Sequence, residues 1–408
     1  MRPFLRYAAV GLIALLAACS GGGSGSSSPS PAGTIVKIGI DLPLSGADTF
    51  AGQTTANGAL LAIDQAKPKA PAGLNLAAFV LDDAVQGVHS AQQGAANTRT
   101  FIADPSVLGM IGPYNSDVAA AEIPLTNAAG LVQVSASTVS DGLTLGADAA
   151  QLRRANPSIN NFFRVCTTDS RQGSAGAQFA RKLGLKRVYI IDDNETYGLD
   201  LANLFEADFK MLGGTVLGHD HVTKDQQDFK ALLTKAAAAK PDAIFFGGTS
   251  STGGGLIRKQ MFDAGLGALP FIGGDGIADQ QFIAVAGKRA DGTYYTVAAP
   301  NALKLPAAQQ FVKDYQNRFH SSVGPYSANA YAAAQVLIAA IERAVRKNGG
   351  KSPNRAQVLQ AVAQTSNLPT PIGPISFDKR GDVTNPVLSL YEIRDGKPNF
   401  ITQLNLKI

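Results

Sequence analysis

The chain has 408 residues, 45% of them hydrophobic and 16% charged, so it is long enough for two or three domains with buried cores. Its formal charge is +5, and Arg2 and Arg6 supply two of these charges within the first 18 residues. The remaining charge is spread thinly and forms no concentrated basic stripe, which excludes the usual pattern of a nucleic-acid-binding protein. We therefore expect no nucleic-acid partner.

An apolar run at residues 7–18, YAAVGLIALLAA, follows the two arginines. It is too short to cross a bilayer and fits the hydrophobic region of a secretory signal peptide. The run ends in LAAC, which resembles the bacterial lipobox and predicts that Cys19 is lipidated after removal of residues 1–18. Residues 19–33 are rich in Gly, Ser and Pro and indicate a flexible tether. The sequence thus predicts a lipid-anchored protein of the periplasm or cell envelope, with an ordinary signal peptide and a chance cysteine as the alternative.

Cys166 is the one other cysteine, so no internal disulfide can form once Cys19 is lipidated. A nucleophilic role is an alternative, but a buried structural thiol is the more common fate of a lone cysteine.

The first half of the chain alternates short apolar runs with amphipathic stretches. Strands are predicted at 34–44, 75–84, 107–113 and 131–137, and helices at 54–66, 91–103 and 116–130. This rhythm is typical of a parallel sheet with helices on both faces.

The same rhythm then restarts. Helices are predicted at 171–184, 198–214, 228–239 and 255–265, and strands at 187–193, 215–222, 242–248 and 270–276. The tail contains two further helices, 307–319 and 327–347, and two closing strands, 375–382 and 386–397. Each tail helix needs a sheet face to cover, so we expect the chain to cross between the two units more than once. The fold class is α/β, with two doubly wound parallel-sheet lobes.

Polar residues follow the predicted strands at their carboxyl ends, where ligands of open parallel sheets bind. Ser116, Ser137 and Thr138 follow strands of the first unit, and Tyr197, Thr249 and Asp275 follow strands of the second. Hydroxyls on one side and a carboxylate on the other suit a small zwitterion. A plain helix cap at Ser116 and a capping turn at residues 135–140 are the alternatives.

Catalytic templates are mostly missing. No Gly-x-Ser-x-Gly occurs, and the glycine-rich stretch 247–255 has no following Lys-Ser/Thr, so it predicts a turn rather than a phosphate loop. His219 and His221 share one face of a strand, but without a third ligand in sight they indicate a half-exposed strand rather than a metal site. The acid pairs 82–83 and 192–193 are predicted to be turn and cap residues. We expect no catalytic residue, metal or cofactor.

An ordered set of motifs, IGIDLPLSG, DDA, IGPYNS, VSAST, DDNETYG, IFFGG, FIGGDG and GPISFDKRGD, extends over nearly all of residues 35–400. Together they resemble the branched-chain amino-acid-binding proteins, the type I periplasmic solute-binding proteins of ABC importers. The resemblance implies one lobe from 34–167 and 299–384, another from 168–298 and 385–408, a three-strand hinge, and a cleft that closes on the ligand.

The resemblance also implies roles for individual residues. Ser116 matches the hydroxyl that takes a ligand carboxylate, and Ser137 and Thr138 match the segment that holds the zwitterion. Tyr197 matches an aromatic residue of the cleft, and Asp275 takes the place of the acid that binds the ammonium group.

Three positions depart from the family's amino-acid binders. Val139 stands where a threonine is usual, and Thr249 and Ala51 each replace an aromatic residue. The sequence therefore predicts a monomeric binding protein that delivers a small polar solute, first of all an amino acid, to an ABC permease of the inner membrane. The alternatives are an amide, a urea-like compound or an aromatic acid as ligand, a sensory ligand-binding domain, or an enzyme on the same fold.

Overall fold

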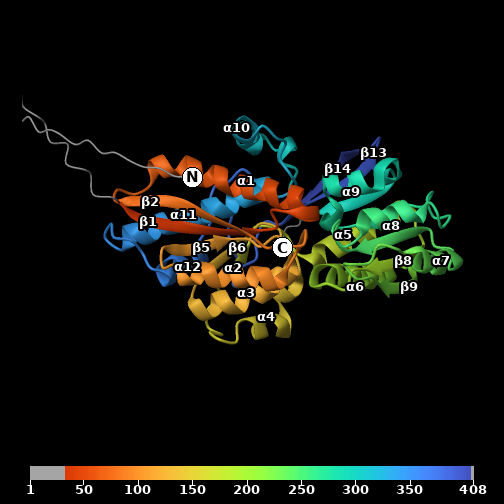
Figure 1. The fold of residues 1–408 in the computed structure, drawn as a ribbon, viewed down its shortest axis with the longest axis horizontal. Helices are drawn as coiled ribbons and strands as arrows, with labels where there is room; N and C mark the ends of the chain where they lie inside the picture. The colour runs from red at the N-terminus through yellow and green to blue at the C-terminus, as the bar shows by residue number, and fades with distance from the viewer. Residues whose placement is uncertain (1–32, 406–408) are drawn as a thin grey trace, which may run out of the picture. The chain divides into compact units, whose positions relative to one another are not determined.

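The computed structural model describes residues 33–405, which contain two lobes, each built on its own sheet (Figure 1). The predicted signal peptide, Cys19 and nearly all of the tether lie outside the described residues.

The first lobe has a five-stranded sheet in the order β2-β1-β5-β6-β7, in which every neighbouring pair is parallel. The strands are β1 (Thr34–Leu42), β2 (Leu74–Asp82), β5 (Val107–Ile111), β6 (Val132–Ser135) and β7 (Phe162–Arg164). A two-stranded hairpin, β3 (Ala84–Val85) and β4 (Val88–His89), follows β2. The inner strands read as nearly continuous apolar runs because helices cover both faces.

Side chains of β1 alternate between two separate cores. Val36, Ile38 and Ile40 pack in the core that contains residues of α1 (Thr49–Ala66) and α11 (Ser327–Lys347). The ring of Phe101 from α2 (Ala91–Ala103) lies against Gly39, where an added Cβ would come within 3.1 Å of that ring. Helix α3 (Ser116–Ala129) packs beside α2, so the two helix pairs lie on opposite sides of the sheet (Figure 1).

The second lobe has a seven-stranded sheet in the order β14-β13-β12-β11-β10-β8-β9. The five strands from β12 to β9 are parallel, and β13 and β14 are added antiparallel. The strands are β8 (Arg187–Asp192), β9 (Thr215–His221), β10 (Ala243–Gly247), β11 (Phe271–Gly273), β12 (Thr293–Val297), β13 (Val387–Arg394) and β14 (Lys397–Asn405). The helices are α5 (Asp169–Lys182), α6 (Thr196–Met211), α7 (Lys230–Ala238), α8 (Gly254–Met261) and α9 (Gln280–Ala286).

Three segments connect the lobes: 165–168 after β7, 298–301 after β12, and 384–386 before β13. They bond to neighbouring segments, since the Thr167 N–H donates to the Ala298 carbonyl at 3.2 Å and the Ser389 hydroxyl to the Ala299 carbonyl at 2.8 Å. Between the second and third crossings, α11 and α12 (Arg355–Ala363) return to the first sheet. The prediction of two parallel-sheet lobes with repeated crossings is confirmed, while the lobe boundaries at 167/168, 298/299 and 384/385 stay a prediction.

The predicted strand at 375–382 is wrong. That segment makes only isolated bridges, Leu368 with Ile375, Phe377 with Val383 and Arg164 with Asp382. Gly381 breaks the extended path with a φ of 93°, and an added Cβ there would lie 2.3 Å from the Phe162 carbonyl oxygen. The sequence prediction missed β7, β12, β14, α4 (Gly146–Leu152), α9, α12 and the β3–β4 hairpin, most of which are short.

Within residues 33–405, no helix combines the length and apolar character needed to span a bilayer.

Candidate functional site

A cavity of about 20 Å³ lies where the two lobes meet, and ten residues line it. Its first-lobe wall is Tyr114, Asn115, Ser116, Ser137, Val139 and Tyr326, and its second-lobe wall is Tyr197, Thr249, Asp275 and Gly276. Five of the six predicted ligand-binding residues are therefore brought together. The reason is topological, because the carboxyl ends of parallel strands meet at one edge of each sheet.

Thr138 is the predicted residue that does not line this cavity. It is fully buried, and its Oγ1 has no hydrogen-bond partner among residues 33–405. Its backbone N–H donates to Ser135 Oγ at 3.1 Å, so it belongs to the same turn as the lining serine, Ser137, which directly precedes it.

The dense hydroxyls after β6 divide into two kinds. Ser135 forms a turn, because its Oγ accepts the backbone N–H of Ser137 at 3.2 Å and donates to the Pro113 carbonyl at 2.9 Å. Ser137 lines the cavity and donates its hydroxyl to the Tyr114 carbonyl at 2.9 Å. The capping-turn interpretation is thus correct for Ser135, while Ser137 is placed at the candidate site.

Ser116 is the first residue of α3, and the N-cap is Asn115, so the plain N-cap interpretation of Ser116 is wrong. Ser116 Oγ accepts the backbone N–H of Ser140 at 3.3 Å, which leaves its own O–H available as a donor. The Oδ1 atom of Asn115 is buried without a hydrogen-bond partner among the described residues. Because the first turn of a helix also presents unpaired N–H groups, this corner of the cavity suits an anionic group.

Asp275 forms the opposite corner. It follows β11, and its Oδ2 accepts hydrogen bonds from Tyr326 and, at 3.2 Å, from Gln172 Nε2. Burial raises the pKa of Asp275, and the hydrogen bonds from Tyr326, Tyr197 and Gln172 offset part of that rise. The carboxylate is therefore held in place by hydrogen bonds from neutral side chains.

Sequence reasoning missed Tyr114 and Tyr326. Their rings make an edge-to-face contact with centroids 5.7 Å apart. The signal is a repeated Gly-Pro-Tyr, at residues 112–114 before α3 and at residues 324–326 before α11. A repeat placed before two helices of one lobe predicts that both tyrosines start a helix at the same edge of the sheet.

It also missed Arg164, a fully buried residue at the end of β7. Its Nε lies 2.6 Å from Asp382 Oδ1, and its Nη1 donates to the carbonyls of Thr138 and Ser140 at 3.1 and 2.7 Å. The Nη2 donates to Thr144 Oγ1 at 2.5 Å. One guanidinium thus fixes the whole segment from residue 138 to 144, which forms part of the cavity wall.

Cys166 is fully buried, and burial raises the pKa of its thiol well above the ordinary value. Its Sγ lies 3.5 Å from the Thr138 carbonyl oxygen. A thiol with a raised pKa is a poor nucleophile, which supports the structural interpretation of this residue.

Hydrogen bonds join the lobes around the cavity. His89 from β4 places Nε2 2.9 Å from Glu195 Oε2, just before α6, while its Nδ1 pairs with Asp48 Oδ2 at 2.8 Å. Ser140 donates its hydroxyl to Asp200 Oδ2 of α6 at 2.8 Å, and the Asp141 N–H donates to the same oxygen at 3.0 Å. These contacts exist only while the two lobes lie against each other.

The predicted turn role is confirmed for Asp82, Asp192 and Asp193 but not for Asp83, whose buried carboxylate has no hydrogen-bond partner within residues 33–405. Asp82 Oδ1 accepts the N–H groups of Leu44 and Ala84, and Asp193 Oδ1 accepts the N–H of Glu195. The glycine-rich stretch 247–255 is a turn that leads into α8, as predicted, with Gly253 at a φ of 112°.

The view that His219 and His221 lack a third partner is wrong. Asp192 of β8 lies between them, with its carboxylate 2.6 Å from His219 Nε2 and 2.8 Å from His221 Nδ1. Within the described residues, a second group of His, Asp and Glu consists of His89, Asp117 and Glu195.

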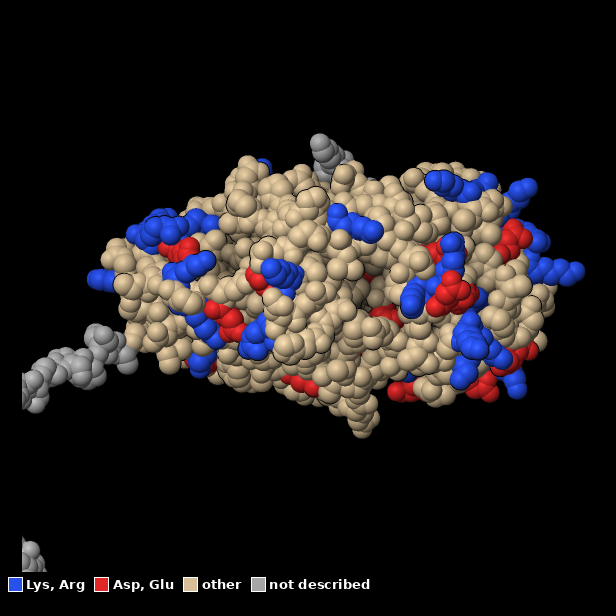
Figure 2. Space-filling model, turned by 90° about the horizontal axis from the view of Figure 1, so that it is seen from above, with Lys and Arg blue, Asp and Glu red and all other residues tan. Residues whose placement is uncertain are grey.

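Charged residues of both signs are mixed on the face drawn in Figure 2, and Lys and Arg form no single stripe there.

The periplasmic binding protein family model matches residues 35–398. Two similar curated proteins are "Leu/Ile/Val-binding protein homolog 3" of Brucella melitensis and "Leu/Ile/Val-binding protein BraC3" of Rhizobium johnstonii. Each is 30% identical over 89% of this chain and 92% of its own length.

Solved structures give the same fold. A leucine binding protein from Thermotoga maritima aligns with a TM-score of 0.79 and 26% identity, over 91% of this chain and 99% of its own. A solute binding protein of R. palustris in complex with benzoate aligns with a TM-score of 0.75 and 22% identity, over 90% and 96%. A match to the family model over most of the residues, together with relatives at 30% identity, shows that this chain belongs to the periplasmic binding protein family.

Proposed function

We propose that the protein is the extracytoplasmic solute-binding component of an ABC importer and that it binds a branched-chain amino acid between its lobes. In this proposal the protein captures the solute and passes it on unchanged to a permease, without chemical turnover.

The observation that carries the proposal is the polarity of the interlobe cavity. The Ser116 hydroxyl and the first turn of α3 lie at one wall, and the Asp275 carboxylate lies at the other. A zwitterion would place its carboxylate at the donors and its ammonium group at Asp275. The names of the curated relatives, which refer to Leu, Ile and Val, point to the same ligand class.

The cavity volume of about 20 Å³ is close to that of one water molecule. An amino acid is much larger, so binding requires the lobes to separate and then close around the ligand. The interlobe bonds His89–Glu195 and Ser140–Asp200 would re-form on closure.

A second ligand class has its own support. The Asp275 carboxylate already accepts hydrogen bonds from Tyr326 and Gln172, so it does not need a ligand cation to be satisfied. Three tyrosines line the cavity, and a neighbour in fold is solved with benzoate. An amide or an aromatic acid is therefore the alternative ligand.

A thermal-shift screen distinguishes the two classes. Leucine, isoleucine and valine are compared with amides and with benzoate, each at several concentrations. A ligand present at 100 times its Kd stabilises the folded state by about 2.7 kcal/mol, which is readily seen as a higher Tm. The proposal of amino-acid binding is wrong if the three branched-chain amino acids leave the Tm unchanged while an acid or amide raises it.

We also propose that the mature protein is anchored through a lipidated Cys19, because LAAC follows an apolar run and precedes a Gly/Ser/Pro tether. Several acyl chains at about 0.8 kcal/mol per buried methylene would hold it firmly at a membrane. Cells labelled with an alkyne fatty acid should yield labelled wild-type protein and unlabelled Cys19→Ser. Equal labelling of both proteins, or of neither, contradicts the anchor.

A further inference from the structure

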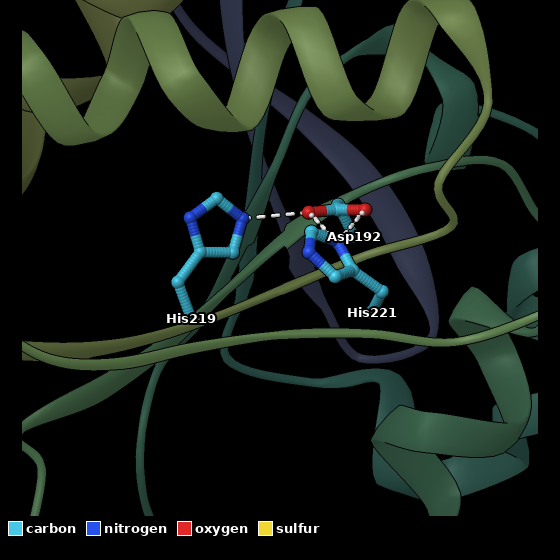
Figure 3. A group of neighbouring side chains, drawn as sticks. All are labelled: Asp192, His219 and His221. Atoms are coloured by element: carbon cyan, nitrogen blue, oxygen red, sulfur yellow. Dashed lines mark hydrogen bonds and ion pairs between the residues drawn. The ribbon is translucent and has the colours of Figure 1, made fainter.

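We infer that Asp192, His219 and His221 form a binding site for a divalent transition-metal ion, with Zn²⁺ as the first candidate, on the second lobe and separate from the interlobe cavity. The ligand atoms of the three residues all lie within 4.8 Å of one another. Figure 3 shows the Asp192 carboxylate between the two imidazole rings.

The sheet register explains why these three side chains meet. His219 and His221 are two residues apart on β9, so they share one face of that strand. In the parallel pairing of β8 with β9, Asp192 is opposite His221 and Ile190 is opposite His219. Asp192 therefore projects from the same face as both histidines, at the carboxyl end of its strand.

The distances suit a metal after a small outward movement of the side chains. The carboxylate lies 2.6 Å from His219 Nε2 and 2.8 Å from His221 Nδ1. In a tetrahedral site with zinc–ligand distances of about 2.0–2.1 Å, neighbouring ligand atoms lie roughly 3.3 Å from one another. Each imidazole nitrogen therefore has to move away from the carboxylate by less than about 1 Å. The centroids of the two rings are 5.4 Å apart, and the ring planes are inclined to each other by 45°.

A second carboxylate supports one of the ligands. Glu206 of α6 places Oε2 2.6 Å from His219 Nδ1, the ring nitrogen that faces away from Asp192. Metal-binding histidines commonly donate their second N–H to a carboxylate, which fixes the tautomer and the orientation of the ring. With Nδ1 protonated toward Glu206, His219 Nε2 has a lone pair for the metal.

Asp192 is also held in place before any metal binds. Its Oδ1 accepts the N–H of Asn194 at 2.7 Å, and its side chain is fully buried. The side chain of His221 is 53% exposed, so an ion can reach the site from solvent on that side. A water molecule would complete a four-coordinate ion there.

The donor set selects the kind of metal. Two imidazole nitrogens and one carboxylate suit Zn²⁺ and its transition-metal neighbours, whereas Mg²⁺ and Ca²⁺ prefer sites made of oxygen atoms. The second group, His89 with Asp117 and Glu195, is less suitable because it offers one imidazole and two carboxylates, and its histidine is buried.

The test is a calorimetric titration of the untagged full chain with ZnCl₂. We expect one ion per chain and a raised Tm that a chelator reverses. His219→Gln and His221→Gln should each weaken binding by more than about tenfold, and Glu206→Gln by roughly ten- to a hundredfold, as for other residues that support a metal ligand. Co²⁺ in place of Zn²⁺ should give visible absorption bands that His221→Gln abolishes.

His320→Asn is the matched control, because His320 follows α10 (Gln309–Phe319) with a φ of 51°, which Asn tolerates. Within residues 33–405, His320 belongs to neither group of side chains that could hold a metal ion. This variant should bind Zn²⁺ like the wild type. His221→Gln changes a half-exposed side chain, so a normal thermal melt without metal is expected. The proposal is wrong if the wild type shows no saturable uptake of Zn²⁺. It is also wrong if His221→Gln binds Zn²⁺ as tightly as the wild type, because the ion would then lie elsewhere, for example at His89.

Discussion

Asp275 and Ser116 lie at opposite ends of the cavity, and their substitution distinguishes the two ligand classes. For an amino acid, Asp275→Asn would leave the ligand's ammonium group buried beside neutral partners, at a cost of about 3–5 kcal/mol. That corresponds to a loss in affinity of roughly a hundred- to several-thousandfold. Ser116→Ala removes one hydrogen bond to a charged group and should cost less, about 1–3 kcal/mol.

Calorimetry on the two variants with the best ligand from the screen gives the answer. If Asp275→Asn binds within threefold of the wild type, the ligand carries no ammonium group at that position. The departures at Val139 and Thr249 would then be explained by an amide or an organic acid.

Asp41 and Glu122 form a buried carboxyl pair that makes stability depend on pH. Burial raises the pKa of Asp41 to about 6, although hydrogen bonds from Glu122 and Asn97 lower it. Burial also raises the pKa of Glu122 well above its ordinary value. Two carboxyls this close share a proton, so Glu122 stays protonated and can donate to Asp41.

The sign of the pH effect follows from this rise. Because the pKa of Asp41 is higher in the folded state, the stability from its protonated form is fully present below pH 3.8 and is lost as the pH rises through about 6. Asp41→Asn mimics the protonated form, so its stability relative to the wild type should improve between pH 5 and pH 8 in urea denaturation.

Asp104→Asn is the control for this experiment, because the pKa of Asp104 is shifted in the opposite direction from that of Asp41. Hydrogen bonds from Lys37 and Ser106 lower the pKa of Asp104 to about 2, so its contribution is lost only as the pH falls through that value. Its effect on stability should be the same at pH 5 and pH 8. A pH-independent effect of Asp41→Asn would show that the carboxyl pair does not share a proton.

At the scale of elements, the loop after β6 depends on Arg164. Its guanidinium donates to the Thr138 and Ser140 carbonyls and pairs with Asp382, which lies just before the third crossing. Arg164→Met would keep much of the side-chain volume but leave the Asp382 carboxylate and two carbonyls without their donor. Loss of one partner of a buried pair costs about 3–5 kcal/mol.

Denaturation midpoints should therefore fall strongly for Arg164→Met, and ligand affinity should fall with them, since the loop carries Ser137. Arg187→Met is the control, because the Arg187–Asp242 pair is half-exposed and lies at the start of β8. Exposed pairs contribute only about 0–1 kcal/mol. Equal effects of the two substitutions would contradict the role given to Arg164.

The elements show which parts of the site could be predicted from the sequence. Ser116, Ser137, Tyr197, Thr249 and Asp275 follow strands, and the rule that strand ends gather at one sheet edge was enough to group them. Arg164 could not be predicted, because its partner Asp382 is 218 positions away and the segment that carries it makes only isolated bridges.

The third partner of His219 and His221 was hidden for a similar reason. Asp192 lies 27 positions before His219, and only the pairing of β8 with β9 brings the two side chains to one face. The two-residue period of a strand predicts that both histidines share one face. It does not show which residue of the neighbouring strand lies opposite them. Short strands such as β7, with three residues, carry too little periodicity to be recognised.

For the whole molecule, the lobes are predicted to close as rigid bodies, and bonds between them set how long a ligand stays. The Glu195 carboxylate pairs with His89 across the lobes, and Lys224 of its own lobe is 3.8 Å away. His89 keeps Asp48 as a partner when Glu195 is removed, so Glu195→Ala leaves no buried charge unpaired in the first lobe. The substitution therefore acts on the closed arrangement of the lobes rather than on the fold of either lobe.

Glu195→Ala should weaken ligand binding by about 1–2 kcal/mol, or roughly five- to thirtyfold, and mainly by faster dissociation. Small-angle scattering should show that saturating ligand reduces the radius of gyration of the wild type, and that Glu195→Ala needs more ligand to reach the same value. Asp314→Asn is the control, because Asp314 bonds to Gln65 and Gln310 within the first lobe and should change neither property. Two results would mean that the contact between β4 and α6 does not control the cleft. One is a radius of gyration of the wild type that ligand leaves unchanged. The other is a ligand dissociation rate of Glu195→Ala equal to that of Asp314→Asn.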